Sequence, residues 1–283
     1  MNNKNVLSAT LYIILFVSLF ILIQSLSFKG GKELVSLLGG TEAADGDYLT
    51  KNGETLAITA VISSLATLIL FIATKWAPVS GNYLKTRPWA VLMWSALIAL
   101  GSILPLQFLA EKINLTMPAG TEEMFESIMK VSWGYVALGM MVPIAEEIVF
   151  RGAILRVLQN ALGERKRWIA IVISALIFGI VHFNLAQGLH AFLIGLLLGW
   201  LYSKTGSILP GFVFHWVNNT VAYLMFNLMP QMNDGKLIDF FHGNDRMMYG
   251  GLFFSLCIFV PSLLQLIGRM PKERNKQLSN KDI

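Results

Sequence analysis

Long apolar segments alternate with shorter polar segments along the whole chain. A bilayer core about 30 Å thick is crossed by a helix of about 20 mostly apolar residues, and eight segments are apolar enough to form such helices. They are residues 6–26, 56–72, 89–109, 133–158, 168–183, 189–202, 208–228 and 248–268. The pattern therefore predicts an all-α fold, a polytopic membrane bundle of eight transmembrane helices.

Polar segments supply the breaks between these helices. Three of them, residues 28–54, 111–130 and 230–246, are long enough to be loops, and the second is expected to hold a short surface helix. Gly163 is the expected C-cap of the fourth span, because glycine readily adopts the left-handed conformation that ends many helices. Pro210 falls in the first turn of the seventh span, where the missing N–H is tolerated.

The order of the spans suggests three parts. Residues 1–130 hold three transmembrane helices with polar outer loops, residues 131–230 hold four core helices, and residues 231–283 hold an outer loop, the last span and a basic tail. Within the core, Gly195 and Gly199 lie four residues apart in the sixth span. Small residues at this spacing allow two membrane helices to approach closely.

Charge is distributed unevenly between the two sides of the predicted bundle. Eight spans place both termini on one side, and the segments on that side are rich in lysine and arginine, as in residues 164–167 and the tail after residue 268. The three long loops on the other side each carry more acids than bases. Since cytoplasmic loops of membrane proteins carry an excess of lysine and arginine, both termini are predicted to be cytoplasmic.

The composition supports a membrane protein and excludes some partners. Hydrophobic residues make up 55% of the chain and charged residues only 14%, against about 25% charged residues in soluble domains. This composition makes the lipid bilayer an expected partner. Nucleic acid is not an expected partner, because no basic patch is interleaved with exposed aromatic residues. The single cysteine, Cys257, excludes an intrachain disulfide and a multi-cysteine metal site, and it is interpreted as a small buried apolar residue.

Two adjacent glutamates and an arginine interrupt the fourth apolar span. Burying an ionised group at bilayer depth costs about 2.5–3.5 kcal/mol on insertion scales, so intramembrane ionisable residues indicate a functional site by default. A buried ion pair that stabilises helix packing would explain Glu147 and Arg151, which share a helix face at i, i+4. It would not explain Glu146, whose side chain points about 100° away around the helix.

Further polar residues lie in neighbouring spans. His182 ends the fifth span, and His215 and Asn219 lie at i, i+4 on one face of the seventh. A lone histidine in an apolar helix is more often a packing residue than a catalyst. Polar residues from three apolar helices can, however, converge in a bundle interior, and no lipid-facing position would accept them. Asn218 is interpreted as forming a hydrogen bond between two helices, and His190 and His242 as solvated or locally bonded histidines.

This set of side chains favours hydrolysis of an amide bond. A carboxylate and a neutral imidazole can together orient and deprotonate a water, and a second imidazole with a carboxamide N–H can donate to a developing oxyanion. No convincing Ser–His or Cys–His pairing and no His-Glu-x-x-His helix is present. Histidine and carboxylate could also ligate a divalent metal, so metal-bound water and glutamate-activated water both remain open from the residues alone.

Three motifs occur in order on successive core spans: Glu-Glu-x-x-x-Arg at Glu146, Glu147 and Arg151, Phe-x-x-x-His at Phe178 and His182, and His-x-x-x-Asn at His215 and Asn219. Each motif alone is weak evidence. Together, each within an apolar span, they resemble the CAAX protease and bacteriocin-processing family of intramembrane endopeptidases, also called CPBP or Abi. The resemblance covers roughly residues 133–228, and no motif position departs from the pattern.

The resemblance implies an eight-helix membrane bundle with a water-accessible cavity and cleavage of a peptide bond in or near the membrane. It implies catalytic roles for Glu146 in activating water, His182 in assisting it, and His215 and Asn219 in stabilising the oxyanion, with Glu147, Arg151 and Phe178 in support. No metal cofactor is expected, because a carboxamide suits an oxyanion hole better than a metal shell. The alternative is Zn²⁺ or another divalent metal on Glu146, His182 and His215.

Substrate and location follow from the same resemblance. Eukaryotic members trim prenylated CAAX proteins, and bacterial members are linked to bacteriocin maturation and immunity, so the expected partner is a membrane peptide or protein that is lipidated or bacteriocin-like. Nothing resembles a eukaryotic targeting signal, and a multi-pass protein of the bacterial cytoplasmic membrane is expected. The other functions considered are a non-catalytic or immunity scaffold and a proton-coupled transporter, since intramembrane acids and histidines also form proton relays.

Overall fold

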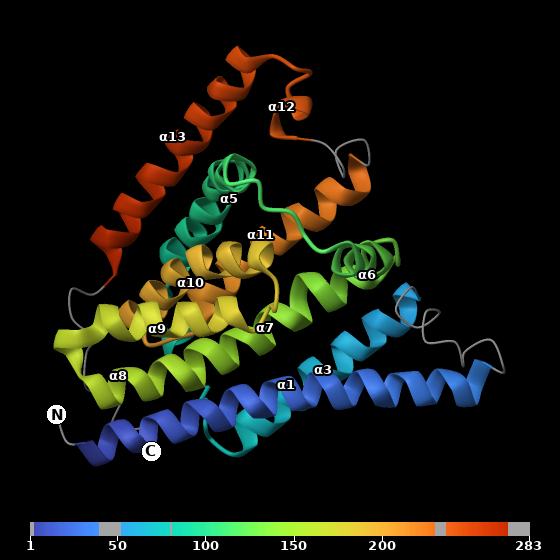
Figure 1. The fold of residues 1–283 in the computed structure, drawn as a ribbon. Coiled ribbons are helices and arrows are strands. Elements are labelled where there is room, and N and C mark those ends of the chain that lie inside the picture. Colours follow the sequence, from blue (N-terminus) through green and yellow to red (C-terminus); the bar gives the residue numbers. More distant parts are fainter. Residues whose placement is uncertain (1–2, 40–51, 80, 230–235, 271–283) are drawn as a thin grey trace.

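The computed structural model describes residues 3–39, 52–79, 81–229 and 236–270. Every regular element in these ranges is helical, which confirms the all-α prediction (Figure 1). The predicted acidic loop residues Glu42, Asp45 and Asp47 and the basic tail after Met270 lie outside the described residues. The long helices are α1 (Asn3–Gly39), α3 (Gly53–Ala73), α5 (Trp89–Lys112), α9 (Arg167–Ile180), α10 (Leu185–Thr205), α11 (Leu209–Leu228) and α13 (Asp245–Arg269).

The fourth predicted span is one continuous helix made of four segments. They are η2 (Val136–Met141), α7 (Val142–Glu146), η3 (Glu147–Leu155) and α8 (Arg156–Leu162). The two η segments are π-helical, and π-helical turns occur frequently at functional sites. We call residues 134–162 the catalytic helix, after the role that the family resemblance implies for Glu146. The short elements are α4 (Asn82–Lys85), α6 (Ala119–Met129), η4 (Glu164–Lys166) and α12 (Leu237–Phe240), and α6 confirms the predicted surface helix.

Five helices in the described part of the chain are long and apolar enough to cross a membrane, namely α1, α3, α5, α10 and α13. The chain is therefore a multi-pass membrane protein. Helix α9 has 14 residues, fewer than the roughly 20 that span a bilayer core. The total of eight spans and the cytoplasmic position of both termini stay predictions.

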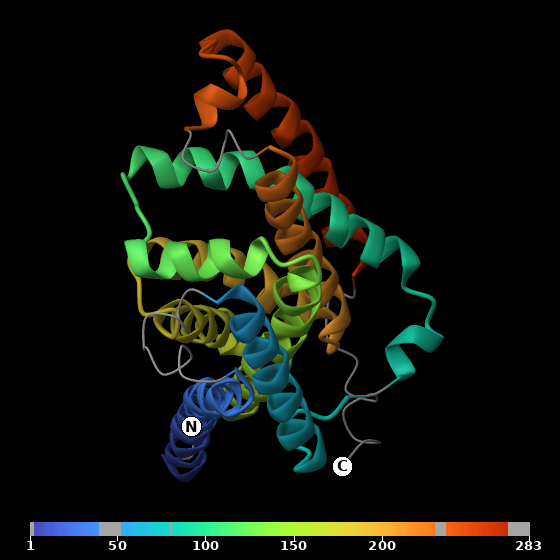
Figure 2. The same cartoon turned by 90° about the vertical axis from the view of Figure 1, so that its right-hand side faces the viewer.

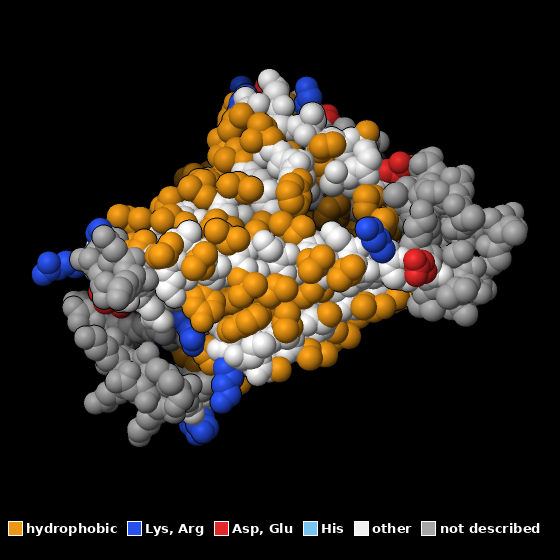
Figure 3. All heavy atoms as spheres, turned by 60° about the horizontal axis from the view of Figure 1, so that its bottom comes forward, with side chains coloured by type: hydrophobic (Ala, Val, Ile, Leu, Met, Phe, Trp, Pro, Cys, Tyr) orange, Lys and Arg blue, Asp and Glu red, His pale blue; other side chains and the backbone are white. Residues whose placement is uncertain are grey.

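The outer surface is apolar over large areas, as expected of helices that face lipid tails (Figure 3). Ile69 and Phe254, for example, are 67% and 69% exposed. The interpretation of Cys257 as a buried residue is wrong, because its side chain lies exposed on α13. An apolar span in a soluble protein must face a core, whereas in a membrane protein lipid provides an equally apolar surrounding.

Helix ends follow the local sequence. Gly163 ends α8 with φ +74°, as predicted, and Gly206 ends α10 with φ +68°. Asn184 caps α10 by accepting a hydrogen bond from the backbone N–H of Gln187 at 2.9 Å, so this helix begins at Leu185 and not at the predicted Leu189. Pro210 lies in the first turn of α11, as predicted.

Close packing joins the helices that carry the site. Helices α9 and α10 lie side by side because small residues face each other. A Cβ atom on Gly195 would lie 3.2 Å from the Ala175 side chain, and one on Gly179 would lie 2.6 Å from the Gly188 carbonyl oxygen. Helix α5 packs against both α11 and α13 (Figure 2), and α1 packs along α3 and α8. The catalytic helix is therefore surrounded by other helices, and its residues 147–155 are all buried.

Candidate active site

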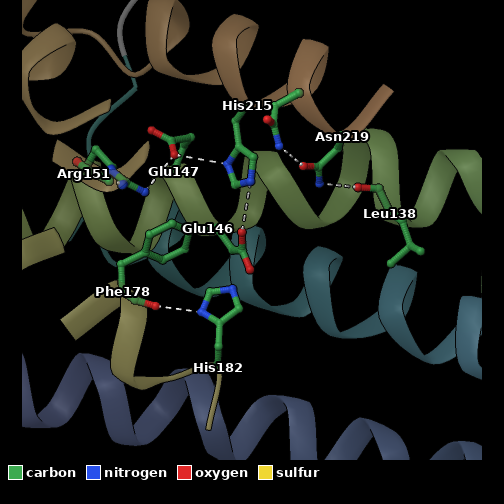
Figure 4. A network of polar contacts seen from close by, with 10 residues as sticks. Leu138, Glu146, Glu147, Arg151, Phe178, His182, His215 and Asn219 are labelled. Atoms are coloured by element: carbon green, nitrogen blue, oxygen red, sulfur yellow. Dashed lines mark hydrogen bonds and ion pairs between the residues drawn. The ribbon is translucent and has the colours of Figure 1, made fainter. Parts of the chain in front are cut away.

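Side chains from three elements converge beside the catalytic helix (Figure 4). Glu146 ends α7 and Glu147 begins η3, His215 comes from α11, and His182 lies two residues beyond the end of α9. The structure thus brings together Glu146 and Glu147, His182, and His215, which the motifs identified on three separate spans. His182 is outside the helix that was predicted to end with it.

Glu147 and Arg151 form the buried ion pair expected from their i, i+4 spacing. Arg151 Nη1 lies 2.9 Å from Glu147 Oε1, and the two side chains are 1% and 0% exposed. Arg151 Nη2 donates to the Gly195 carbonyl at 3.4 Å, and its guanidinium lies 4.4 Å from the centre of the Phe178 ring. The arginine therefore has a carboxylate, a carbonyl and an aromatic face as partners for its buried charge.

His215 lies between the two adjacent glutamates. Its Nδ1 is 3.4 Å from Glu147 Oε1, and its Nε2 is 3.6 Å from Glu146 Oε2. Glu146 and Glu147 are neighbours on one helix, so their side chains point in different directions. The imidazole of His215 has two ring nitrogens, and each of them faces one of the two carboxylates. Both distances are longer than a well-formed hydrogen bond, so these contacts alone hold the ring loosely.

The two carboxylates differ in access to solvent. The Glu146 side chain is 13% exposed, whereas that of Glu147 is 0% exposed. A Cβ atom on Gly211 would lie 2.7 Å from Glu147 Oε2, so a glycine is needed where α11 passes this carboxylate. Glu146 is therefore partly accessible from outside the protein, whereas Glu147 is sealed by packing.

The backbone orients the His182 ring. Its Nδ1 lies 2.8 Å from the Phe178 carbonyl oxygen, and since a carbonyl only accepts, the ring donates through Nδ1–H. In a regular α-helix the backbone N–H of His182 would donate to the Phe178 carbonyl. That carbonyl is available to the ring because the N–H donates to the Gly179 carbonyl instead. In the neutral ring Nε2 is then a proton acceptor, and the ring points toward Glu146 (Figure 4).

Phe178 packs against both histidines. It is 1% exposed, and its ring centre lies 5.1 Å from that of His182 and 6.0 Å from that of His215, both edge to face. The same ring contacts Phe150 at 4.8 Å. Phe178 therefore separates the two imidazoles and restricts the rotation of each, which agrees with the supporting role expected of this position.

Asn219 bonds to the catalytic helix. Its side-chain Nδ2 donates to the Leu138 carbonyl at 2.9 Å, and its Oδ1 accepts from the side chain of Asn218 at 3.3 Å. In the π-helical turn the N–H of Val142 bonds to Ala137, and the next residue, Pro143, has no N–H. The Leu138 carbonyl therefore lacks its usual helical partners and takes a side-chain donor. Asn218, expected to bridge two helices, bonds to its neighbour on the same helix.

Of the remaining histidines, His190 lies near the site and His242 lies away from it. His190 lines an apolar pocket between α5 and α10 and is close enough to His182 and His215 to interact electrostatically with both, whereas His242 is exposed after α12. Among the described residues, no three His, Cys, Asp or Glu side chains are grouped to hold a metal ion. Metal independence and the alternative ligand set of Glu146, His182 and His215 both stay predictions.

The motifs did not reveal several residues that shape the site. Tyr135 and Trp216 are hydrogen-bonded to each other next to it, Gly211 makes room for a carboxylate, and the Leu138 carbonyl receives Asn219. One signal was present in the sequence: Pro143 in the middle of an apolar span removes a backbone donor and so releases a carbonyl. The other two contacts join residues 81 positions apart (Tyr135 and Trp216) and 64 positions apart (Glu147 and Gly211) and have no local signature.

Comparison with known proteins supports the resemblance. Residues 128–221 match the family described as "Type II CAAX prenyl endopeptidase Rce1-like". The match covers about a third of the chain and includes all seven positions of the three motifs. It confirms the predicted resemblance to CAAX-type intramembrane proteases for this segment. No curated protein and no solved structure matches the chain.

Proposed function

With residues 128–221 assigned to the Rce1-like family of CAAX-type proteases, we propose that this protein is an intramembrane endopeptidase that hydrolyses a peptide bond of a membrane-associated or lipidated substrate. One observation carries the proposal. A partly exposed carboxylate, Glu146, lies between two histidines in the interior of a helical membrane protein, while its neighbour Glu147 is sealed and neutralised by Arg151.

Glu146 and His182 activate the attacking water. The Glu146 carboxylate and the Nε2 lone pair of His182 face the same space. Each can accept a hydrogen bond from one O–H group of a water molecule. The water oxygen attacks the scissile carbonyl carbon as its proton moves to Glu146. When the carbon–nitrogen bond breaks, that proton passes to the leaving amine. Positioned acid–base groups of this kind contribute about 10²–10⁴-fold.

His215 and Asn219 stabilise the negative charge on the carbonyl oxygen. A carboxamide has two N–H donors. One is engaged by Leu138, and the other is offered to the oxyanion. The imidazole of His215 supplies a second donor once the substrate draws it away from one of its two carboxylate neighbours. Glu147 and Arg151 form the buried ion pair beside this ring, and no step of this mechanism passes through a metal ion.

The test is cleavage by the purified protein in detergent. An internally quenched, prenylated CAAX peptide and its unprenylated twin serve as substrates. Glu146→Gln is expected to lower kcat at least 10²-fold, and His182→Ala at least tenfold, by loss of general-base catalysis. Glu54→Gln, an exposed glutamate in the first turn of α3, serves as the control and should cleave like the wild type. Unchanged cleavage by Glu146→Ala and His182→Ala would show that the assignment is wrong.

A further inference from the structure

The contacts that His215 makes with the two glutamates are too long to determine where α11 lies along the catalytic helix. They measure 3.4 and 3.6 Å, whereas N–H···O hydrogen bonds are commonly about 2.9 Å. The position of His215 must therefore be determined by other contacts between these two helices.

Such contacts lie on the neighbouring side of α11. Trp216 Nε1 donates to the Tyr135 hydroxyl at 2.7 Å, and the same hydroxyl lies 3.0 Å from Thr220 Oγ1. One turn further along α11, the Tyr223 hydroxyl donates to the Val131 carbonyl at 3.1 Å. The rings of Tyr135 and Tyr223 also pack at 5.4 Å between centres. Each hydrogen bond joins α11 to the start of the catalytic helix or to the turn just before it.

The spacing of these residues links them directly to the site. Trp216 follows His215, and Thr220 follows Asn219, so the bonded residues and the site residues are consecutive pairs on one helix. A helix is rigid over a few residues. Any slide or rotation of α11 that breaks the Trp216 bond must therefore also displace His215.

Tyr135 is itself held in place by a glycine. A Cβ atom on Gly139 would lie 2.5 Å from the ring of Tyr135, so the ring packs this closely against the π-helical segment η2 only because residue 139 has no side chain. The wide π turn and the glycine together place the Tyr135 hydroxyl within reach of α11.

We propose that Tyr135 and Trp216 are positioning residues of the protease: their hydrogen bond sets the register of α11 against the catalytic helix and thereby holds His215 between Glu146 and Glu147. Neither residue takes part in a chemical step. The inference rests on the proposed function for its kinetic consequence, but the register itself can be measured without a substrate.

The kinetic experiment compares Tyr135→Phe, Trp216→Phe and the double variant on the quenched CAAX peptide. Since a 1 Å displacement of a catalytic group can cost about 10²-fold, each single variant is expected to lower kcat on the order of tenfold and to leave KM within about twofold. The double variant should lose about the same factor as Tyr135→Phe alone, because both substitutions remove the Tyr135–Trp216 bond and Tyr135→Phe also removes the contact with Thr220. Gly139→Ala, which displaces the ring, should have the same effect. Tyr249→Phe, an exposed tyrosine on α13, is the matched control.

The outcomes separate the alternatives. If Trp216→Phe retains full kcat while Tyr135→Phe loses it, the Tyr135–Trp216 bond does not set the register of α11 and the proposal is wrong. Multiplicative losses in the double variant would also overturn it, since the two side chains would then act independently. If the wild type cleaves no peptide, the proposed function fails, and amide hydrogen exchange in detergent still tests the register. Tyr135→Phe should speed exchange over residues 211–223 severalfold and Tyr249→Phe should not; equal exchange in both refutes the positioning role.

Discussion

Replacing Arg151 with methionine leaves the Glu147 carboxylate buried without its cation. The two side chains are 1% and 0% exposed and lie 2.9 Å apart, so no solvent can replace the lost partner. Removing one member of a buried pair typically costs about 3–5 kcal/mol. The substitution also removes the contacts of Arg151 with the Gly195 carbonyl and the Phe178 ring. The expected loss of unfolding free energy is therefore toward the upper end of this range. At about 2–4 °C per kcal/mol for a chain of this size, Tm should fall by about 10 °C or more.

The assay is unfolding in mixed micelles by increasing sodium dodecyl sulfate, together with thermal unfolding. The double variant Glu147→Gln with Arg151→Met should recover most of the lost stability, because no unpaired charge remains buried. Lys130 and Glu126 provide a matched control, since this pair has the same i, i+4 spacing and lies at 2.8 Å, but its side chains are 67% and 32% exposed. Lys130→Met should cost about 0.5 kcal/mol or less.

Three results would refute this reasoning. The first is a loss below about 1 kcal/mol in Arg151→Met, which would mean that water or another cation reaches Glu147. The second is a double variant no more stable than Arg151→Met, which would attribute the loss to packing and not to charge. The third is an equal loss in Lys130→Met, which would show that burial is not the cause.

Three further predictions concern the same site. Gly211→Ala places a Cβ atom 2.7 Å from Glu147 Oε2 and should lower both Tm and kcat, whereas Gly250→Ala, which meets no atom within 4 Å, should change neither. Asn219→Ala leaves the Leu138 carbonyl without its side-chain donor and should cost about 1–3 kcal/mol in unfolding free energy; if the proposed oxyanion role is right, kcat also falls about 10²–10³-fold. Treatment with a strong chelator followed by gel filtration should leave peptide cleavage unchanged; loss of activity that added Zn²⁺ restores would establish a metal requirement instead.

The helices and their ends were predictable because their causes are local. Apolar segments of sufficient length form helices in a bilayer, where every backbone group must be bonded within the chain. Gly163 and Pro210 lie at helix termini as their backbone preferences require. Two ends were misplaced, since α9 stops before His182 and α10 begins at Leu185. The error over Cys257 arose because an apolar surrounding was equated with a protein core, and in a membrane lipid provides the same surrounding.

The partners within the site were less predictable. The i, i+4 pairing of Glu147 with Arg151 followed from helix geometry, and the motif order indicated that His182 and His215 belong to one site. The sequence did not reveal that His215 contacts both glutamates, since this depends on how α11 crosses the catalytic helix. It also did not reveal the two π-helical segments, because a π turn is stabilised by tertiary hydrogen bonds to its released carbonyls. The Asn219 side chain donates to the Leu138 carbonyl, and the Ser174 hydroxyl donates to the Phe150 carbonyl.

Read alone, the amino-acid order was enough to identify a helical membrane protein, the polar residues of the candidate site and the protease family they resemble, because hydrophobicity, caps and short motifs act over a few positions. Only the tertiary structure decided which glutamate is sealed by packing, that one imidazole lies next to both carboxylates, and that Tyr135 is bonded to Trp216 on α11. These properties depend on contacts between residues far apart in the chain, and such contacts form only when the helices pack.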